Sequence, residues 1–572
     1  MSKAIYIKVR EEKHHLKYKS RLEKILPSLI PDNIPNCKYE IKEDGTLFFG
    51  VINPAENNMC SQNSLCLGQI LGNCDGWDIP LSLYPDGAFC LFRSNGNILE
   101  IVSDVVGSRT IWYYFDMEVF IASNSQRAII SLINSYSLNK AVIPWMLSTG
   151  TMGPFLSWDE RISMLEINSN LILDVSKWDY TINKNPVLFK VDRISEEKQE
   201  ELLEKELLKA FEGLNLNLSK WVLPLSGGVD SRAILFYLKK FNPTFSKLKS
   251  LTWGKPGAEN RKGNDAYIAQ KLADYLIIEH EFAPLSVTSE NVNTIFSRFL
   301  NAGEGRVDAI SGYTDGFEIW KKLFENNVTG VIRGEQTFGG PEVDNERDAR
   351  AAVGISFCED YANLSNQDFN FKLQQLPEHL QRKTDESILT WRDRLIIEYR
   401  APILKAALND LKLAYVEIST PLISKGITER ITKMNDEQRL KKSLFKSVIK
   451  KISIPIELAT EVAIETPNEI FNNPEILELF NSQLNKPFNE KVFPAGFYSY
   501  IKKSLGDVVI SLQGKPKKAS LISKIKKLIP KKYKKKLNKL KLTHQIPVTR
   551  LAFRAFIISR MIETFQTDIK KN

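Results

Sequence analysis

The sequence predicts an α/β protein in which an antiparallel N-terminal half precedes a parallel sheet with helices on its faces. Strand-like segments and turns prevail up to about residue 190, whereas the later chain alternates short apolar runs with helical patterns. Hydrophobic residues make up 43% of the 572 residues, which is enough for large cores. No apolar run reaches the roughly 20 residues that cross a bilayer, and the N-terminus lacks an apolar signal region. We therefore expect a cytoplasmic protein.

The N-terminal half opens with a strand pattern. Ile5, Ile7 and Val9 alternate with amphipathic neighbours, as in a strand with two different faces. An Asn-Gly-Asn sequence at residues 95–97 indicates a hairpin turn. Further strand-like segments lie at residues 45–52, 87–93, 98–102 and 119–122.

Near residue 190 the spacing of apolar residues changes from a strand pattern to a helical pattern, which predicts a domain boundary there. Leucines at helical spacing run through residues 196–214, and helical patterns dominate again over residues 385–452. Candidate strands between them are residues 221–225, 248–253, 276–278 and 328–332. Strands that alternate with helices predict a parallel sheet. The expected parts are an antiparallel domain at 1–190, a parallel-sheet domain at 191–510 and a basic helical C-terminal arm at 511–572.

The net charge of +10 is concentrated in one segment. Residues 515–541 hold thirteen lysines and no acidic residue, so the rest of the chain carries −3. Apolar residues recur at helical spacing among these lysines, and such a segment can lie on an anionic membrane surface or remain solvated. Nucleic acid is not expected as a partner, because Tyr533 is the segment's only aromatic residue.

The six cysteines and five histidines form no recognisable framework. No cysteine pair has the C-x-x-C spacing, and no histidine lies in a metal-ligand motif. We expect free thiols.

A glycine-rich loop is the most specific local feature. The string Ser226-Gly227-Gly228-Val-Asp230-Ser231 follows an apolar strand and opens a helix. Adjacent glycines allow a close backbone approach, and the free N–H groups of a helix start attract anions. The carboxylate of Asp230 suits Mg²⁺ that bridges phosphates. The plainer interpretation is a Gly-Gly turn with a serine cap. A Walker motif is absent.

This loop resembles the pyrophosphate loop of the ATP-pyrophosphatase superfamily, which includes asparagine synthetase, β-lactam synthetase and the lasso-peptide macrolactam cyclases. The resemblance implies that ATP is cleaved between its α- and β-phosphates, giving an acyl-adenylate and pyrophosphate. It also implies an Ntn-hydrolase-like antiparallel αββα domain of the class II glutamine-amidotransferase type, followed by an adenine-nucleotide α-hydrolase-like synthetase domain.

Further motifs resemble asparagine synthetase in the same chain order, over residues 1 to about 455. They are Asp86–Phe89 (D-G-x-F), Asp104–Arg109 (D-x-x-G-x-R), Thr252–Gly254 after a strand, Asp265–Ala269 (D-x-x-x-A), Gly334–Gly340 (the second pyrophosphate motif), Val416–Leu422 (V-E-x-R-x-P-F) and Lys442–Lys446 (K-x-x-L-R). The resemblance implies that Thr252, Gly254 and Gly334 join the loop in binding the nucleotide.

The sequence departs from the motifs of asparagine synthetase at several positions. Ser2 stands where glutamine-hydrolysing members carry a nucleophilic cysteine, so the N-terminal domain is expected to be inactive as a glutaminase. Glu335 replaces the usual aspartate of the second motif. Ile332 stands where some members have an acidic or polar residue, and Ser419 where the family has arginine.

The resemblance assigns roles to four side chains. Asp230 and Glu335 would hold Mg²⁺, and Lys442 would neutralise charge in the transition state. Glu417 would act as a base or orient the amine. The alternatives are a solvated lysine at 442 and a salt-bridged strand residue at 417.

The resulting prediction is an ATP-dependent amide ligase that adenylates a carboxylate and transfers it to an amine or ammonia. A sugar acid in polysaccharide assembly would suit the basic segment. Closure of a peptide macrolactam is the alternative, because Arg333-Gly334-Glu335 resembles the R-G-D-E of lasso cyclases. A non-catalytic nucleotide-binding module is the alternative from another class.

Overall fold

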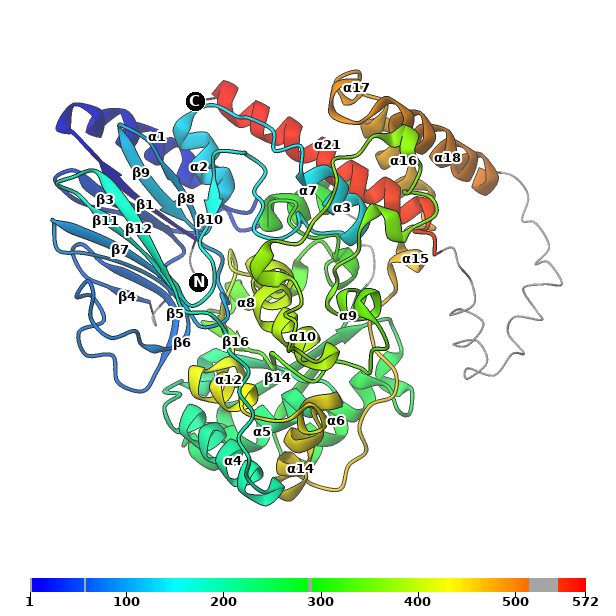
Figure 1. The fold of residues 1–572 in the computed structure, drawn as a ribbon. Helices are drawn as coiled ribbons and strands as arrows, with labels where there is room; N and C mark the ends of the chain where they lie inside the picture. Colours follow the sequence, from blue (N-terminus) through cyan, green and yellow to red (C-terminus); the bar gives the residue numbers. More distant parts are fainter. Residues whose placement is uncertain (1–2, 56–57, 286–290, 514–543, 572) are drawn as a thin grey trace.

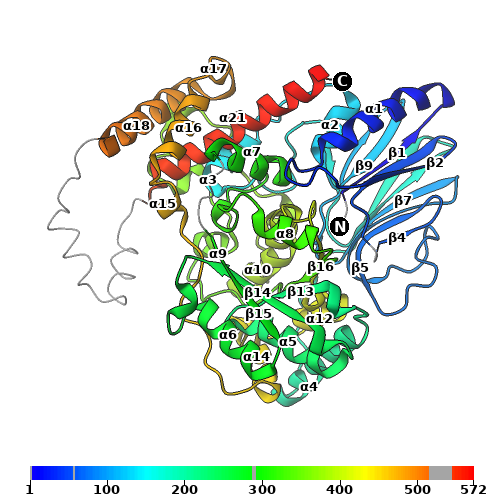
Figure 2. The ribbon, with the colours of Figure 1, turned by 180° about the vertical axis from the view of Figure 1, so that it is seen from behind.

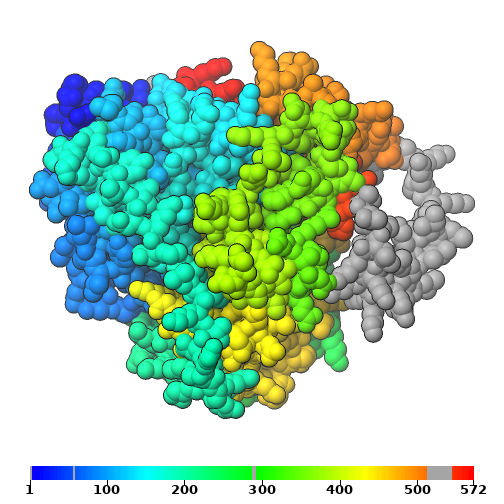
Figure 3. All heavy atoms as spheres, in the orientation of Figure 1, coloured from blue at the N-terminus to red at the C-terminus, as the bar shows by residue number. Residues whose placement is uncertain are grey.

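The computed structural model describes residues 3–55, 58–285, 291–513 and 544–571. Ser2 and the predicted membrane-binding segment 515–541 lie outside the described residues. Figures 1 and 2 show an N-terminal pair of sheets beside a larger α/β part. In the space-filling view of Figure 3, these parts pack closely along their shared border.

Two antiparallel sheets build the N-terminal half, as predicted. The first has the order β10 (Ser163–Met164), β8 (Trp112–Phe115), β9 (Val119–Ser123), β1 (Lys3–Val9), β3 (Leu47–Ile52), β2 (Tyr39–Asp44). The second has the order β12 (Asp179–Lys184), β11 (Ser169–Asp174), β7 (Ile98–Ser103), β6 (Asp86–Ser94), β5 (Leu65–Leu71), β4 (Met59–Cys60). The predicted hairpin joins β6 and β7, where the Asn95 N–H donates to the Ile98 carbonyl over 3.2 Å.

The two faces of strand β1 belong to two different hydrophobic cores. Ala4 and Tyr6 belong to the core between the two sheets, whereas Ile5, Ile7 and Val9 pack towards the helices on the outer face of the first sheet. These helices are α1 (His15–Ser28) and α2 (Gln126–Ile133). Both faces of β1 are buried, so its side chains do not alternate between exposed and buried positions.

A five-stranded parallel sheet organises the second half. Its order is β15 (Glu279–Pro284), β14 (Lys249–Gly254), β13 (Trp221–Pro224), β16 (Gly330–Ile332), β17 (Glu417–Ser419), and every neighbouring pair is parallel. The α/β class, with antiparallel sheets before a parallel one, is therefore confirmed. The chain passes from the last antiparallel strand at Lys184 to helix α4 at Glu196.

Helices cover both faces of this sheet. On one face Trp221 and Leu223 pack with α4, α5, α6 and α14, and on the other Val222 packs with α7 and α8. Their bounds are α4 (Glu196–Glu212), α5 (Val229–Phe241), α6 (Asp265–Leu276), α7 (Val292–Gly303), α8 (Glu318–Glu325) and α14 (Ser443–Ile452).

One predicted strand is wrong. Residues 276–278 end helix α6 at Leu276, pass through a left-handed Ile277 (φ 56°) and lead into β15 at Glu279. Leu276 completes the apolar face of α6 and the left-handed residue ends the helix, so the apolar run belongs to a helix end.

The C-terminal helix α21 (Val548–Lys571) also differs from the predicted arm. It is largely buried and crosses the molecule from α2 to α16 (Pro474–Leu484) and α18 (Ala495–Gln513) (Figures 1 and 2). Buried Asp308 anchors it, accepting hydrogen bonds from Arg550 Nε over 3.0 Å and Arg554 Nε over 2.7 Å. Its buried apolar residues, which include Leu551, Phe553 and Phe556, lie on more than one face of the helix, as in a helix that is packed on all sides.

Candidate functional site

The strand order places two loops together. In a parallel sheet of this order, the direction of winding reverses between β13 and β16, and ligands bind outside the carboxyl ends of the strands at that point. The loop after β13 carries Ser226 to Ser231, and the loop after β16 carries Gly334 and Glu335. The sequence-predicted nucleotide loop and the second motif therefore share one edge of the sheet.

Hydroxyl groups fix the shape of the glycine-rich loop. Ser231 Oγ donates to the Ser226 carbonyl over 3.0 Å and accepts from the Ser226 N–H over 3.2 Å. The Gly228 N–H donates to Ser226 Oγ over 3.3 Å. Helix α5 begins directly afterwards, so its first N–H groups, which have no intrahelical partner, point out of this turn. The arrangement suits an anion.

Gly334 lies against the start of α5. A Cβ atom on Gly334 would come within 2.8 Å of Asp230 Cβ and 3.0 Å of the Ser231 nitrogen, so a side chain there would push the two loops apart. Gly227 and Gly254 instead lie against a later segment, which contains Ala459 and Ala463. Their added Cβ atoms would lie 2.4 Å from Ala459 and 2.5 Å from Ala463. These two predicted glycines thus allow close packing of that segment on the loop.

A cavity of about 520 Å³ opens at this edge. Seven predicted site residues line it: Ser226, Gly228, Asp230, Ser231, Thr252, Gly334 and Lys442. Its apolar wall contains Leu225, Leu251, Trp253 and Val462. Thr252 Oγ1 donates to the Leu225 carbonyl and so ties the ends of β13 and β14 together. The lining combines anion-binding groups with an apolar wall.

Asp230 and Lys442 form an ion pair in the cavity. Lys442 Nζ donates to Asp230 Oδ2. Asp230 Oδ1 is buried without a hydrogen-bond partner among the described residues. Such an oxygen has open coordination capacity, so the carboxylate fits a divalent cation.

Glu335 is less available than Asp230 as a ligand for Mg²⁺. It does not line the cavity. Its Oε2 accepts from Asn409 Nδ2 over 3.3 Å, and its Oε1 lies 3.6 Å from Arg333 Nε. Within the described part of the chain, no group of three or more His, Cys, Asp or Glu side chains could hold a metal ion. Mg²⁺ is commonly bound by one or two carboxylates together with substrate phosphates, and Asp230 can supply such a carboxylate.

The structure does not bring Glu417 into this site. Glu417 is fully buried on β17 and pairs with Arg109, which follows β7 in the N-terminal half. Burial by itself would raise the pKa of Glu417, but Arg109 and the Ile418 N–H hold it below the usual range. This pairing matches the alternative interpretation of Glu417 as a salt-bridged strand residue, whereas its role as a base or an amine-orienting group stays a prediction.

Several residues of the cavity lining had no site role in the sequence analysis, although Asp265 and Arg333 lie in motifs that it named. Arg333 lines the cavity, but only the likeness to an R-G-D-E sequence drew attention to it. Asp265 accepts from the Gly227 N–H over 3.2 Å, and burial raises its pKa. Residues 462–464 close the cavity from a segment that lies beyond all the recognised motifs, so no sequence feature indicated them.

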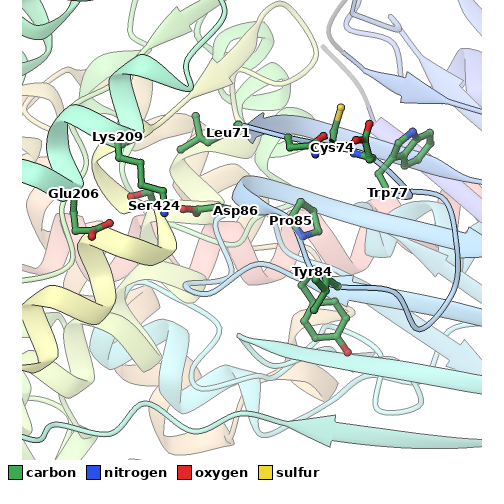
Figure 4. Close-up of a pocket in the computed structure, with 14 residues that line it drawn as sticks. Leu71, Cys74, Trp77, Tyr84, Pro85, Asp86, Glu206, Lys209 and Ser424 are labelled. Atoms are coloured by element: carbon green, nitrogen blue, oxygen red, sulfur yellow. Dashed lines mark hydrogen bonds between the residues drawn. The ribbon is translucent and has the colours of Figure 1, made fainter.

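A second cavity, of about 390 Å³, lies where the two halves meet (Figure 4). Asp86, from the D-G-x-F motif, accepts from the Lys425 N–H at the start of α12 (Lys425–Thr432) over 2.6 Å. Lys209 and Glu206 of α4 line the opposite wall (Figure 4). Asp86 therefore joins the two halves.

Fold and site together define an α/β domain with a glycine-rich anion loop at the switch point of a parallel sheet. Residues 221–335, from the start of β13 to Glu335, match the family model described as asparagine synthase. This match confirms the predicted asparagine synthetase-like relationship for that part of the chain.

A Methanocaldococcus jannaschii protein named "Putative asparagine synthetase (glutamine-hydrolyzing) 2" is 24% identical over 269 residues, or 45% of this chain. The match spans about half of that relative, 48% of its length. Among solved structures, the "structure of the allosteric regulatory enzyme of purine biosynthesis" overlaps 49% of this chain and 80% of its own, at 9% identity and a TM-score of 0.21. A score this low carries no argument.

Proposed function

We propose that the protein is an ATP-dependent amide ligase that adenylates a carboxylate, releases pyrophosphate and transfers the acyl group to an amine or ammonia. The observation that carries this proposal is the Ser226–Ser231 loop at the switch point, with Asp230 and Lys442 in the same cavity. The asparagine synthase match over residues 221–335, which contain the loop and Asp230 but not Lys442, supports it.

The loop residues would hold the phosphates of ATP. The N-terminal N–H groups of α5, with the hydroxyls of Ser226 and Ser231, would bind the pyrophosphate portion. The apolar wall around Leu251 and Trp253 would accept the adenine. Mg²⁺ bound by Asp230 would neutralise phosphate charge, and Glu335 would join it only after giving up its contacts to Arg333 and Asn409.

Lys442 would change partners when ATP binds. In the structure its ammonium neutralises Asp230, and its backbone is left-handed with φ 63°. Once a cation binds Asp230, the ammonium is free to contact the α-phosphate, where negative charge develops during attack by the carboxylate. Lysine suits this exchange, since its charge sits at the end of a flexible stem.

Nitrogen would come from an external amine or ammonia. Ser2 stands where a thiol nucleophile is needed. Buried ion pairs join the two halves, including Arg109 with Glu417 and Lys3 with Glu304. Sugar-acid amidation and macrolactam closure both agree with this proposal. A nucleotide-binding module without catalytic activity is the alternative to it.

Membrane contact through residues 515–541 is also proposed, on their sequence alone. No helix among the described residues is long and apolar enough to span a bilayer. The lysine-rich segment would bind an anionic surface peripherally.

Asp230→Asn tests the nucleotide site. We expect at least a tenfold weaker affinity for MgATP by calorimetry, because a carboxylate of the cavity lining, with a buried oxygen that has no hydrogen-bond partner among the described residues, loses its charge. The exposed Asp179→Asn is the matched control and should bind as the wild type does. Equal affinity of Asp230→Asn and wild type would refute the proposed site. Pyrophosphate exchange into ATP with added carboxylic acids then separates an active ligase from a binding module.

A further inference from the structure

The backbone at Lys441 and Lys442, here called the lysine turn, has an unusual conformation. Both residues are left-handed, with φ of 51° and 63°, although neither is a glycine. Side chains disfavour this conformation, so two such residues in succession persist only where their surroundings hold them. Lys442 is also the cation that reaches Asp230 in the candidate site. The contacts that hold the lysine turn therefore also place the Lys442 ammonium.

The lysine turn packs on the two glycines that end the second pyrophosphate motif. A Cβ atom on Gly339 would lie 2.9 Å from the Lys442 nitrogen. The Lys441 N–H donates to the Gly340 carbonyl over 3.2 Å. A Cβ atom on Gly340 would lie 2.7 Å from Arg392 Nε. The backbone of this motif is thus enclosed between the lysine turn and the side chain of Arg392.

A buried carboxylate, Asp393, lies behind this contact. It belongs to helix α10 (Ile388–Leu395). Its Oδ1 accepts from Arg392 Nη2 over 2.7 Å, and its Oδ2 accepts from Arg439 Nε over 2.9 Å. Arg392 also donates to the Pro341 carbonyl, directly after the two glycines. One carboxylate therefore holds the arginine on the second motif and also holds Arg439.

Arg439 carries this connection to Lys442. It ends helix α13 (Asp436–Arg439) and stands three residues before Lys442 in the chain. Its guanidinium also donates to the Asp436 carboxylate and to Thr390 Oγ1. With its side chain fixed in this way, Arg439 fixes the start of the segment that forms the lysine turn.

Stability alone gives little reason for this cluster. The side chains of Arg392, Asp393 and Arg439 are all fully buried. Replacing a buried ion pair by apolar side chains is often neutral or stabilising, because burial removes both charges from water. Hydrogen bonds between charged groups, in contrast, fix the geometry of the groups that they join. Here they join the second motif to the segment that leads to Lys442.

We propose that Asp393 is a positioning residue for Lys442. Through its two arginine partners, it keeps the lysine turn seated on the second motif. The Lys442 ammonium then reaches Asp230 and, once MgATP has bound, the α-phosphate. Asp393 itself does not line the nucleotide cavity. The contact to the α-phosphate rests on the proposed function, whereas the contact to Asp230 is a feature of the structure itself.

Asp393→Asn removes one of the two arginine contacts. An amide has a single acceptor oxygen, its nitrogen can only donate, and a guanidinium has no acceptor. One arginine therefore loses its partner, and the lysine turn should relax. Arg439→Lys is the second variant, because it keeps the buried charge and loses only the guanidinium fork.

Acetylation of lysines, followed by mass spectrometry well below the melting temperature, reports the state of Lys442. Only the neutral amine reacts, and pairing with Asp230 favours the charged form, so wild-type Lys442 should react more slowly than exposed Lys441. In Asp393→Asn, Lys442 should react roughly fivefold faster or more, while the rate of Lys441 stays nearly constant. Arg439→Lys should give an intermediate rate, and it decides the question if Asp393→Asn folds poorly.

Glu100→Gln is the control matched in burial. It breaks the fully buried pair of Arg93 and Glu100 in the N-terminal half, so it should lower the melting temperature without raising the reactivity of Lys442. An unchanged rate of Lys442 in folded Asp393→Asn, or an equal rise in Glu100→Gln, would overturn the positioning role.

Pyrophosphate exchange tests the link to the chemistry. With an acid that supports exchange, Asp393→Asn should lower kcat about tenfold or more and leave the KM for MgATP nearly constant. The double variant with Lys442→Gln should be no slower than Lys442→Gln alone, because Asp393 acts through Lys442. Multiplied losses in the double variant would overturn the proposal. If no acid supports exchange in the wild type, the proposed function fails, while lysine acetylation still decides the positioning role.

Discussion

Glu417→Gln is the most informative single change, because it separates a buried ion pair from a catalytic base. Glu417 is fully buried, and only 4% of the Arg109 side chain is exposed. The substitution keeps the shape of the side chain but leaves Arg109 buried beside a neutral amide. Removing one partner of a buried ion pair typically costs about 3–5 kcal/mol in unfolding free energy.

The size of the thermal shift follows from chain length. At about 2.1 cal/mol/K per residue, 572 residues have an unfolding entropy of about 1.2 kcal/mol/K if they unfold as one unit. The melting temperature of Glu417→Gln should therefore fall by about 2–4 °C, and by about twice as much if half of the chain unfolds independently. Differential scanning calorimetry at matched scan rates measures this shift, since large chains often unfold irreversibly.

Two further variants complete the test. Arg109→Met should destabilise by a similar amount, because it leaves Glu417 unpaired. Arg109→Met combined with Glu417→Leu should recover most of the loss, since an apolar pair of similar volume replaces both charges. Additive losses in the double variant, or an unchanged melting temperature in Glu417→Gln, would refute the buried-pair interpretation. An unchanged melting temperature in Glu417→Gln together with lost pyrophosphate exchange would instead assign a catalytic role to Glu417.

The stabilisation that Glu417 contributes should decrease as the pH falls. The pKa of Glu417 is lower in the folded protein than in the unfolded chain, despite the opposing effect of burial. Its stabilisation is therefore complete above the unfolded carboxylate pKa of about 4.3 and is lost as the pH falls through the folded value. The difference in melting temperature between wild type and Glu417→Gln should be largest near neutral pH and should shrink below about pH 4.

Three other predictions follow from the structure and the sequence. Asp308→Asn should lower the melting temperature and loosen α21, seen as faster amide exchange over residues 548–571, because Arg550 and Arg554 lose their shared anion; unchanged exchange there would contradict the anchoring role. Ser2→Ala should leave synthetic activity unchanged, and the wild type should release no glutamate from glutamine; glutamate release that depends on Ser2 would overturn the inactive-domain prediction. Deletion of residues 515–541 should abolish co-sedimentation with anionic liposomes at low salt while MgATP binding persists; lipid binding by the deletion protein would place the contact elsewhere.

The local patterns of the chain predicted most of its elements. The strand predicted from Ile5, Ile7 and Val9 and the hairpin turn predicted at residues 95–97 are both present. Each depends only on residues that are close together in the sequence. The apolar run at 276–278 was ambiguous for a physical reason: a buried helix end and a buried strand need the same residue types. The burial of α21 could not be predicted from its own residues, since its anchor, Asp308, lies more than 240 positions earlier.

The candidate site was predictable only in part. The loop from Ser226 to Ser231 was found because the glycines and hydroxyls that shape it are adjacent in sequence. The pairing of Glu417 with Arg109, 308 residues away, has no local sequence feature. The π-helix at residues 396–405 likewise has no local sequence feature, since these residues were expected only to be helical.

The charges at this edge of the sheet favour one interpretation of the function. Four cationic side chains, Arg333, Arg400, Lys405 and Lys442, gather there, while Asp230 and Glu335 supply the negative charge. Lys442 is neutralised by Asp230, and Arg333 lies beside Glu335, which leaves the charges of Arg400 and Lys405 without a carboxylate partner. Arg333 and Lys442 line the nucleotide cavity, and both already face a carboxylate. A divalent cation that arrives with ATP would take over Asp230 and release Lys442 for the phosphates, so the proposed ligase is expected to bind ATP as its magnesium complex.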